Sequence, residues 1–338
     1  MQKKSFLLFL TLSVFLISCS NSSDTLSFES MNTFMTIKSF GKNSKQANIL
    51  AQKEILNLEN LISTTNPKSE VYILNHMENP KLQVNALTKD ILTYALKTAE
   101  KTDGALNPAL YPITSAWGFT NENYRIPDDK EISELLKLTD YSKISINENL
   151  VSMPKDFMID LGAVGKGYAG DLAISILKSQ GINSAILDLG GNIQTLGKKA
   201  DGTNWSIGIK NPWGGNVIAG LQISNKAVIT SGGYERYFTV NDQNYIHIFD
   251  CKTGKPAQND IASISIITKK GLYGDALSTA LFVMGKEKAL EYWRKNKNSP
   301  DGAFDMIIIS TDKKITYTTG LENNIQILAN FLIVEQAN

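Results

Sequence analysis

Hydrophobic side chains along this chain recur at two spacings, one typical of helices and one typical of strands. Residues 44–62 place apolar side chains every three to four positions, which predicts an amphipathic helix. Thr88 is expected to cap a second helix, which ends at Asp103-Gly104. By the same spacing, further helices are expected at 129–138, 167–180, 272–284 and 286–295.

Strand-like alternation dominates the N-terminal part and much of the second half of the chain. Residues 25–39 are expected to form a strand with a bend near Asn32. Many of the later strands are neighbours in sequence and are joined by short turns, which favours antiparallel pairing. The pattern therefore predicts an α+β fold of mixed, largely antiparallel sheets packed with helices, formed by residues 25–338 as a single domain. The shorter strands are expected at 143–146, 156–160, 184–190, 205–210, 217–223, 227–231, 237–240, 245–250, 261–267 and 304–310.

The composition is that of an ordinary globular protein with enough apolar material for a core. Hydrophobic residues make up 42% of the 338 positions and charged residues 20%. The formal net charge is +1, so no basic field favours binding to nucleic acid. A phosphate-bearing ligand would therefore depend on local hydrogen-bond donors.

The N-terminus has the features of an export signal. The cationic start MQKK precedes the apolar run FLLFLTLSVFLI, which is short for a membrane span. LISCS follows and resembles the lipobox of bacterial lipoproteins, so residues 1–18 are expected to be a signal peptide and Cys19 to be lipidated. Residues 19–24 are then a tether, and the protein is lipid-anchored to a bacterial membrane outside the cytoplasm. The alternative is a buried first helix with an incidental cysteine.

Cysteine chemistry is limited to two positions. With Cys19 lipidated, Cys251 is the remaining cysteine, which excludes an intrachain disulfide and a cysteine metal site.

A glycine-rich motif occurs in the middle of the chain. Gly165, Gly167 and Gly170 have G-x-G-x-x-G spacing, and an apolar run and Asp188 follow, as in a dinucleotide-binding Rossmann unit. The surrounding pattern argues against that interpretation, because the next 80 residues predict strands without helices, whereas a doubly wound fold alternates the two. A second interpretation is that small residues let the helix pack close to a sheet.

Close packing does not explain two charged residues in the same segment, Asp160 and Lys166. A helix N-terminus offers free N–H groups and a positive dipole end, and a nearby lysine adds charge. A ligand that carries phosphate is therefore the interpretation we favour for residues 160–170.

A second group of polar residues lies in the predicted helix at 272–284. Asp275 and Thr279 are four positions apart and share one helical face. A carboxylate with a hydroxyl suits Mg²⁺, which takes oxygen ligands and completes its shell with water and substrate phosphates. The alternative is that Asp275 caps the helix while Thr279 lies on the surface, and spacing alone favours this alternative.

A third group lies near predicted strand ends. Tyr234, Glu235, Arg236 and His247 are found there, and His247 is one of two histidines in the chain. A lone histidine is more often structural than catalytic, so the residue type by itself leaves its role open.

Together these segments resemble one family, the FAD:protein FMN transferases, also called the ApbE or thiamine biosynthesis lipoprotein family. The resemblance runs from Met31 over nearly the whole remaining chain and rests on motifs in a fixed order. Asn32, Thr65, Asn192 and Cys251 stand where the family usually has Gly, Tyr, Asp and Pro. The matching segments are MNTFMTI, STTNPKSEVYILN, TDGALNP, SAWGF, DLGAVGKGYAGD, LDLGGNI, TSGGYERYF, HIFDCKTGKP and GDALSTALFVMG.

The resemblance implies a T-fold-like domain, unrelated to the Rossmann fold, that binds FAD with Mg²⁺ at its pyrophosphate. The implied metal ligands are Asp275, Thr279 and the backbone carbonyl of Ala163, while Ser278 lies where some relatives have an additional acidic ligand. Thr65 has no ring to stack on FAD, which weakens that contact. The implied FAD contacts are Met31, Thr65, Ala105, Leu106, Asn107, Asp160, Lys166 and Phe249.

The implied reaction splits FAD, passes FMN to a Ser or Thr hydroxyl of an exported protein and releases AMP. His247 is the candidate base for the hydroxyl proton. The implied partner is an exported flavodomain, such as a subunit of a sodium-translocating NADH:quinone reductase. Two alternatives remain open, a Mg²⁺-dependent FAD pyrophosphatase and a non-enzymatic FAD-binding lipoprotein.

Overall fold

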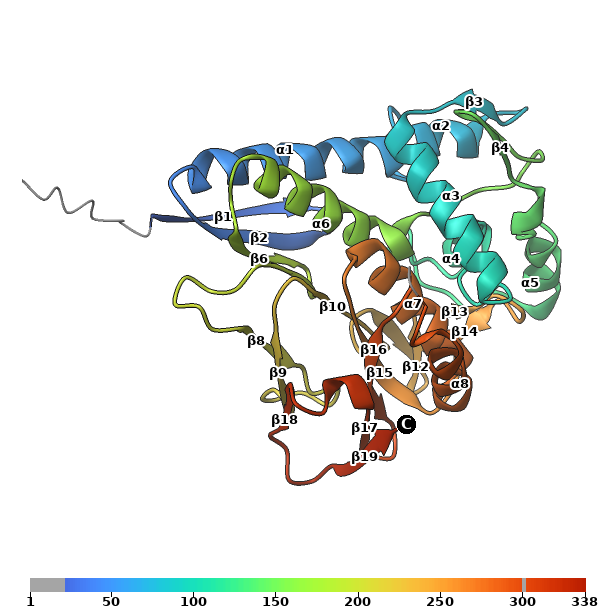
Figure 1. Cartoon of the computed structure of the whole chain (residues 1–338). Coiled ribbons are helices and arrows are strands. Elements are labelled where there is room, and N and C mark those ends of the chain that lie inside the picture. Colours follow the sequence, from blue (N-terminus) through green and yellow to red (C-terminus); the bar gives the residue numbers. More distant parts are fainter. Residues whose placement is uncertain (1–21, 300–301) are drawn as a thin grey trace, which may run out of the picture.

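The structure is a computed structural model that describes residues 22–299 and 302–338. A nine-stranded sheet with the order β1-β2-β6-β7-β10-β15-β16-β17-β19 forms its centre (Figure 1). Neighbouring strands are antiparallel except for β17 and β19, which confirms the predicted α+β fold with largely antiparallel sheets. The strands are β1 (Ser23–Ser30), β2 (Thr33–Phe40), β6 (Ser184–Leu189), β7 (Asn192–Leu196), β10 (Ala227–Gly232), β15 (Ile261–Thr268), β16 (Asp305–Ser310), β17 (Lys314–Thr318) and β19 (Ile333–Ala337).

Three helices, α1, α6 and α7, cover one face of this sheet. α1 and α6 run side by side over β1, β2 and β6, and α7 continues this layer over β10 and β15 (Figure 1). Alternation along β2 explains the packing, because Met35 and Ile37 are fully buried against α1 whereas Phe34 is 62% exposed. The helices are α1 (Ser44–Ile62), α2 (Glu70–His76), α3 (Ala86–Lys101), α4 (Tyr111–Ala116), α5 (Asp129–Leu136), α6 (Gly162–Ser179), α7 (Gly271–Met284) and α8 (Lys286–Asn296).

The second half of the sheet is buried on both faces. Ile264 and Ile266 of β15 pack in a cluster with α7 and α8, and Ile267 packs in another cluster with a small sheet, β18-β9-β8. Double burial explains why this strand is a nearly continuous apolar run. The remaining strands are β3 (Lys81–Gln83), β4 (Ser145–Asn147), β5 (Leu150–Ser152), β8 (Trp205–Ile209), β9 (Ala219–Ile223), β11 (Tyr237–Val240), β12 (Gln243–Ile246), β13 (Phe249–Asp250), β14 (Lys255–Pro256) and β18 (Ile325–Ile327).

Several local expectations were wrong. Thr88 is buried inside α3, and Asn85 caps that helix instead, its side chain accepting a hydrogen bond from Leu87 N–H. Residues 156–160 form no strand, and residues 111–116 form α4, a helix that the pattern did not predict. The predicted bend near Asn32 is a tight turn in which Met31 and Asn32 both have positive φ.

The expected tether ends earlier than predicted. Ser23 and Asp24 belong to β1, where they pair with Phe40 and Ser39, so the ordered sheet begins inside the expected 19–24 segment. The expected signal peptide, residues 1–18, and the lipidated Cys19 lie outside the described residues. Among the residues that are described, no helix is long and apolar enough to cross a membrane.

Candidate active site

The glycine motif lies within a helix that begins five residues before the expected start at 167. α6 begins at Gly162, so Gly165, Gly167 and Gly170 all belong to its first half. A Cβ atom at Gly167 would lie 2.3 Å from the carbonyl oxygen of Gly271, at the start of α7. The motif therefore allows α6 and α7 to cross at very short distance, and the Rossmann interpretation is wrong, because β6 after this helix pairs antiparallel with both its neighbours.

Polar side chains fix this helix crossing. Asp171 accepts hydrogen bonds from the first amides of α7, Gly271 N–H at 2.7 Å and Leu272 N–H at 3.0 Å. The side-chain amide of Gln194 donates to the Gly167 carbonyl at 2.9 Å. The start of α7 and the first half of α6 are therefore held in one position relative to each other.

Asp275 occupies the centre of this crossing. Its carboxylate accepts hydrogen bonds from Gly167 N–H at 2.7 Å and from the side-chain amide of Asn192 at 3.0 Å, and the residue is only 6% exposed. Burial raises the pKa of this carboxyl, whereas the charge of Lys166 and the two hydrogen bonds act in the opposite direction. Among the described residues no cation forms an ion pair with Asp275.

The expected metal ligands lie on the two helices that cross at this carboxylate. Ala163 is in the first turn of α6, four positions before Gly167, whose N–H donates to Asp275, and in a regular helix the Ala163 carbonyl points toward that N–H. Thr279 lies one turn after Asp275 on α7 and is half-buried. A buried carboxylate held by two neutral donors, beside a carbonyl and a hydroxyl, is a donor set suited to a hard cation.

Ser278 has a different environment from these three residues. It is fully buried, and its hydroxyl donates to the carbonyl of Asp275 at 3.0 Å and accepts from the hydroxyl of Ser231 at 2.8 Å. Its hydrogen bonds connect α7 to β10. The described residues also contain no cluster of three or more His, Cys, Asp or Glu side chains that could hold a metal, so a metal site here depends on the mixed oxygen set.

Asp160 lies directly before α6. Its carboxylate accepts from Gly162 N–H at 2.7 Å, and its own N–H donates to the carbonyl of Pro108 at 2.8 Å. Burial raises the pKa of Asp160, and the positive charges of Lys166 and Arg236 oppose this rise. These two cations therefore lie near the N-terminus of α6, where the helix dipole also favours an anion.

His247 lies near the same cations. Its backbone N–H donates to the carbonyl of Arg236 at 3.1 Å, and its ring Nδ1 lies 3.1 Å from the same oxygen. A carbonyl can only accept, so Nδ1 carries the proton and Nε2 has a free lone pair. Burial lowers the pKa of His247 to about 4, with the charges of Arg236 and Lys166 contributing.

Comparison with known proteins identifies the family. The model of the ApbE family matches residues 31–303. The chain belongs to the ApbE family. It is 32% identical over 264 residues to an FAD:protein FMN transferase of Treponema pallidum, an alignment that covers 73% of this chain and 72% of that protein.

Solved ApbE structures share the whole fold. The ApbE protein of Thermotoga maritima superposes with a TM-score of 0.82 at 30% identity, over 90% of this chain and 99% of that one. The flavin transferase ApbE of Vibrio cholerae superposes with a TM-score of 0.80 at 26% identity, with the same coverage. The predicted ApbE-like fold is therefore confirmed.

Met31 is one of the residues expected to contact FAD in this ApbE chain, and it lies beside α6. Its sulfur is 4.0 Å from the position of a Cβ at Gly165, and its backbone N–H donates to Glu59 at 2.7 Å. Glu59 also accepts from the hydroxyl of Ser30, which fixes the positive-φ turn at Met31. Sequence analysis missed Glu59, because on the predicted helix it is simply one polar residue among several.

Thr65 lies between α1 and α2, and residues 105–107 lie between α3 and α4. Thr65 is exposed. Burial and the negative charge of Asp160 raise the pKa of Tyr111, and a hydrogen bond with the side chain of Thr64, the neighbour of Thr65, opposes this rise. Asn107 uses its side chain within the protein, donating to the Thr139 carbonyl at 2.8 Å and accepting from Ala109 N–H at 2.8 Å. A ligand contact from Asn107 would therefore have to add to these two hydrogen bonds or replace them.

The remaining expected FAD contacts, Ala105, Leu106 and Phe249, have side chains that are small or buried. Leu106 and Phe249 are each 3% exposed, and Phe249 packs edge-on against Phe119 in a separate aromatic cluster. The carbonyl of Ala105 lies 3.8 Å from the sulfur of Cys251, whose thiol pKa is raised to about 12 by burial. Main-chain atoms are therefore what Ala105, Leu106 and Phe249 have to offer a nucleotide.

Sequence analysis also missed Asp171, Asn192 as a partner of Asp275, and Gln194. Asp171 directly follows the glycine motif, so its position was a usable signal. Asn192 and Gln194 lie on β7, a strand that the alternation pattern did not predict because four of its five residues are buried.

Proposed function

We propose that this chain is an FAD:protein FMN transferase that uses Mg²⁺ and attaches FMN to a Ser or Thr hydroxyl of a target protein. The products are AMP and a protein phosphoester of FMN. The observation that carries the proposal is the carboxylate of Asp275, buried at the α6–α7 crossing without a cationic partner among the described residues. The ApbE family and relatives that are named FAD:protein FMN transferases support the same activity.

Asp275, Thr279 and the Ala163 carbonyl would hold the Mg²⁺ ion. When bound, the ion would neutralise negative charge on the phosphate oxygens during transfer. Lys166 and Arg236 would orient the same oxygens, because the charges of both act at Asp160, directly before the positive end of α6. Asp171 and Gln194 keep this geometry fixed by holding α6 against α7.

His247 is proposed to accept the proton of the acceptor hydroxyl. The hydroxyl oxygen forms a bond to the phosphorus of the FMN half, the bond to the bridging oxygen breaks, AMP leaves with that oxygen, and the proton passes to Nε2. Neutral His247 has a free lone pair at Nε2 because Nδ1 faces the Arg236 carbonyl. The negative charge of a bound pyrophosphate would raise the pKa of His247 from its low value and strengthen it as a base.

A gel assay tests the function. The purified protein is incubated with FAD, Mg²⁺ and an acceptor domain that carries a Ser/Thr-Gly-Ala-Thr-like target. We expect a fluorescent acceptor band on a denaturing gel and release of AMP. Release of AMP and free FMN at equal rates with and without acceptor would instead identify an FAD pyrophosphatase, and tight FAD binding without either product would identify a flavin-binding protein.

The setting of the reaction is part of the proposal. The predicted signal peptide and lipidated Cys19 would place the enzyme on the outer side of a bacterial cytoplasmic membrane or beyond it. The acceptor would then be an exported flavodomain, such as a subunit of a sodium-translocating quinone reductase. Labelling of Cys19 with a fatty acid analogue in cells, and its absence in Cys19→Ala, would test the anchor.

A further inference from the structure

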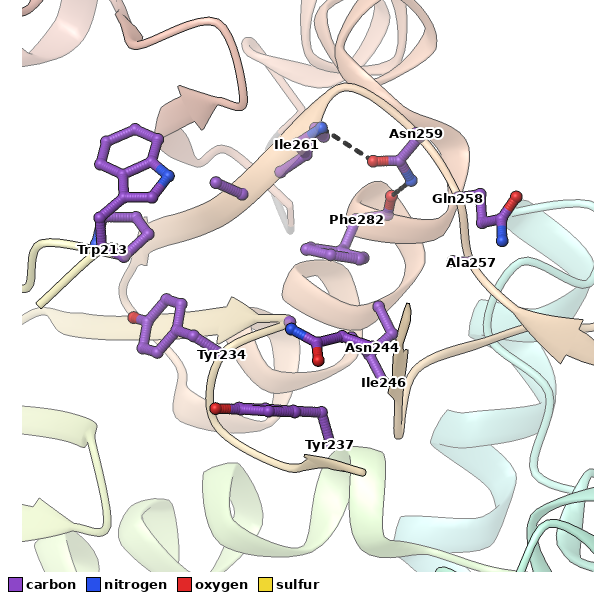
Figure 2. A pocket seen from close by; sticks show the side chains of 13 residues that line it. Trp213, Tyr234, Tyr237, Asn244, Ile246, Ala257, Gln258, Asn259, Ile261 and Phe282 are labelled. Atoms are coloured by element: carbon purple, nitrogen blue, oxygen red, sulfur yellow. Dashed lines mark hydrogen bonds between the residues drawn. The ribbon is translucent and has the colours of Figure 1, made fainter. Parts of the chain in front are cut away.

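A pocket of about 660 Å³ is lined by residues of the β11–β12 hairpin and of α7 (Figure 2). The segment 257–261 also lines it, as do Trp213 and Tyr237, which are about half exposed, and Phe282 of α7, which is buried. None of its 13 lining residues is charged. Its volume is in the range of pockets that hold ligands.

One wall of the pocket is an unpaired strand edge. β11 and β12 form a two-stranded sheet, and His247 N–H donates to the Arg236 carbonyl, so positions 236 and 247 face each other as a hydrogen-bonded pair. In an antiparallel ladder such pairs alternate with pairs whose N–H and C=O groups point outward. The backbone groups of Asn244 and Ile246 therefore point away from β11.

The same edge is covered a few residues further on. Ala257 N–H donates to the Ile248 carbonyl at 2.8 Å, and β13 pairs with β14 beyond it. The chain then diverges from β12, because Asn259 turns toward α7, donating to the Phe282 carbonyl and accepting from Ile261 N–H (Figure 2). This divergence leaves the edge at Asn244 and Ile246 open to the pocket within the described part of the chain.

Two residues that line the pocket are neighbours of the proposed reaction site. Ile246 directly precedes the candidate base, His247, and Phe282 shares a face of α7 with the candidate metal ligand Thr279, three positions earlier. An extended chain lying along β12 would therefore pass close to both groups. A transferase acting on proteins must hold its acceptor at such a place.

We propose that the outer edge of β12 binds the acceptor protein, whose segment around the target hydroxyl adds to the edge as an extended strand. This inference rests on the proposed transferase function. Backbone pairing would supply affinity, and the uncharged pocket would select small or apolar, uncharged side chains around the target hydroxyl. Trp213 and Tyr237, 45% and 48% exposed, would cover the bound segment.

Two proline variants of one hairpin test the proposal. Asn244→Pro removes an outward N–H from the β12 edge, whereas Thr239→Pro removes its cross-strand counterpart from the β11 edge. Both variants also lose the same side-chain hydrogen bond, from Thr239 Oγ1 to Asn244 Oδ1. Thr239→Pro is therefore a closely matched control for folding of the hairpin.

The measurements are binding of the acceptor domain in the presence of FAD without Mg²⁺, the KM for acceptor with Mg²⁺, and binding of FAD. For Asn244→Pro we expect acceptor binding and KM to weaken by about tenfold, as for the loss of a main-chain hydrogen bond, while FAD binding is unchanged. Thr239→Pro should stay within about twofold of the wild type, as expected for an edge that the acceptor does not use.

Equal weakening in both variants, no weakening in Asn244→Pro, or no acceptor binding by the wild type would overturn the proposal. If the wild type binds the acceptor but does not transfer FMN, the proposed function is wrong. Acceptor binding by the two proline variants would then still test the proposed docking edge. If Asn244→Pro does not fold, Trp213→Ala should weaken acceptor binding and Val334→Ala, an apolar position on β19 with a similar exposed fraction, should not. Equal binding by those two variants would also overturn the proposal.

Discussion

At the scale of single residues, burial lowers the pKa of His247 and raises the pKa of Asp275. His247 is kept neutral by burial beside two cations, and Asp275 is a buried carboxylate near one lysine. Neutral His247 suits the role of proton acceptor, and we expect His247→Gln to lower the rate of FMN transfer by about 10²-fold or more. FAD affinity should be unchanged, which a fluorescence titration checks. A variant with the wild-type transfer rate would show that another group accepts the proton.

The same histidine makes stability depend on pH. Its pKa is about 4 in the folded protein, whereas the ordinary value, expected in the unfolded chain, is 6.5. Between these two pH values the unfolded chain binds a proton that the folded protein does not, which favours unfolding. The wild type should therefore lose about 3 kcal/mol of unfolding free energy as the pH falls from 7 to 4, a loss that His247→Gln lacks. Urea unfolding at both pH values measures the difference.

At the scale of elements, the α6–α7 crossing determines the site. A methyl group at Gly167 would clash with backbone at Gly271, so Gly167→Ala should separate the two helices and cost about 1–3 kcal/mol of unfolding free energy. FMN transfer should fall as well, because Asp275 bonds to the amide of Gly167. Thermal unfolding of Gly167→Ala and of Ser175→Ala, an exposed position on the same helix, makes the comparison. Equal stability of the two variants would show that the crossing tolerates a side chain.

The helices were easier to predict than the function of the glycines. α1 has the predicted bounds, because its apolar residues follow one face without interruption. The glycine spacing is compatible with either a phosphate turn or a helix crossing, and the choice depends on Gly271, which is about 100 residues away in the chain. β7 and β19 were missed for opposite reasons, since β7 is nearly all buried and four of the five residues of β19 are not.

At the scale of the whole molecule, the site joins three distant parts of the chain. The segment before α6, the start of α7 and the end of β12 contribute Asp160, Asp275 and His247. Ordered motifs allowed the family and its ligand to be inferred from the sequence. Hydrogen-bond partners such as Asn192 could not be inferred, because they depend on how α7 lies over the sheet. The open β12 edge likewise follows from where the chain diverges after Ala257.

Transfer of FMN should depend on the buried carboxylate of Asp275. The most direct measurement is the intact mass of an acceptor domain co-expressed with the wild type or with Asp275→Asn, which keeps the size of the side chain and removes its charge. We predict that the acceptor gains the mass of FMN with the wild type and does not gain it with Asp275→Asn, while both proteins unfold at similar temperatures. Full FMN attachment by Asp275→Asn would contradict the account.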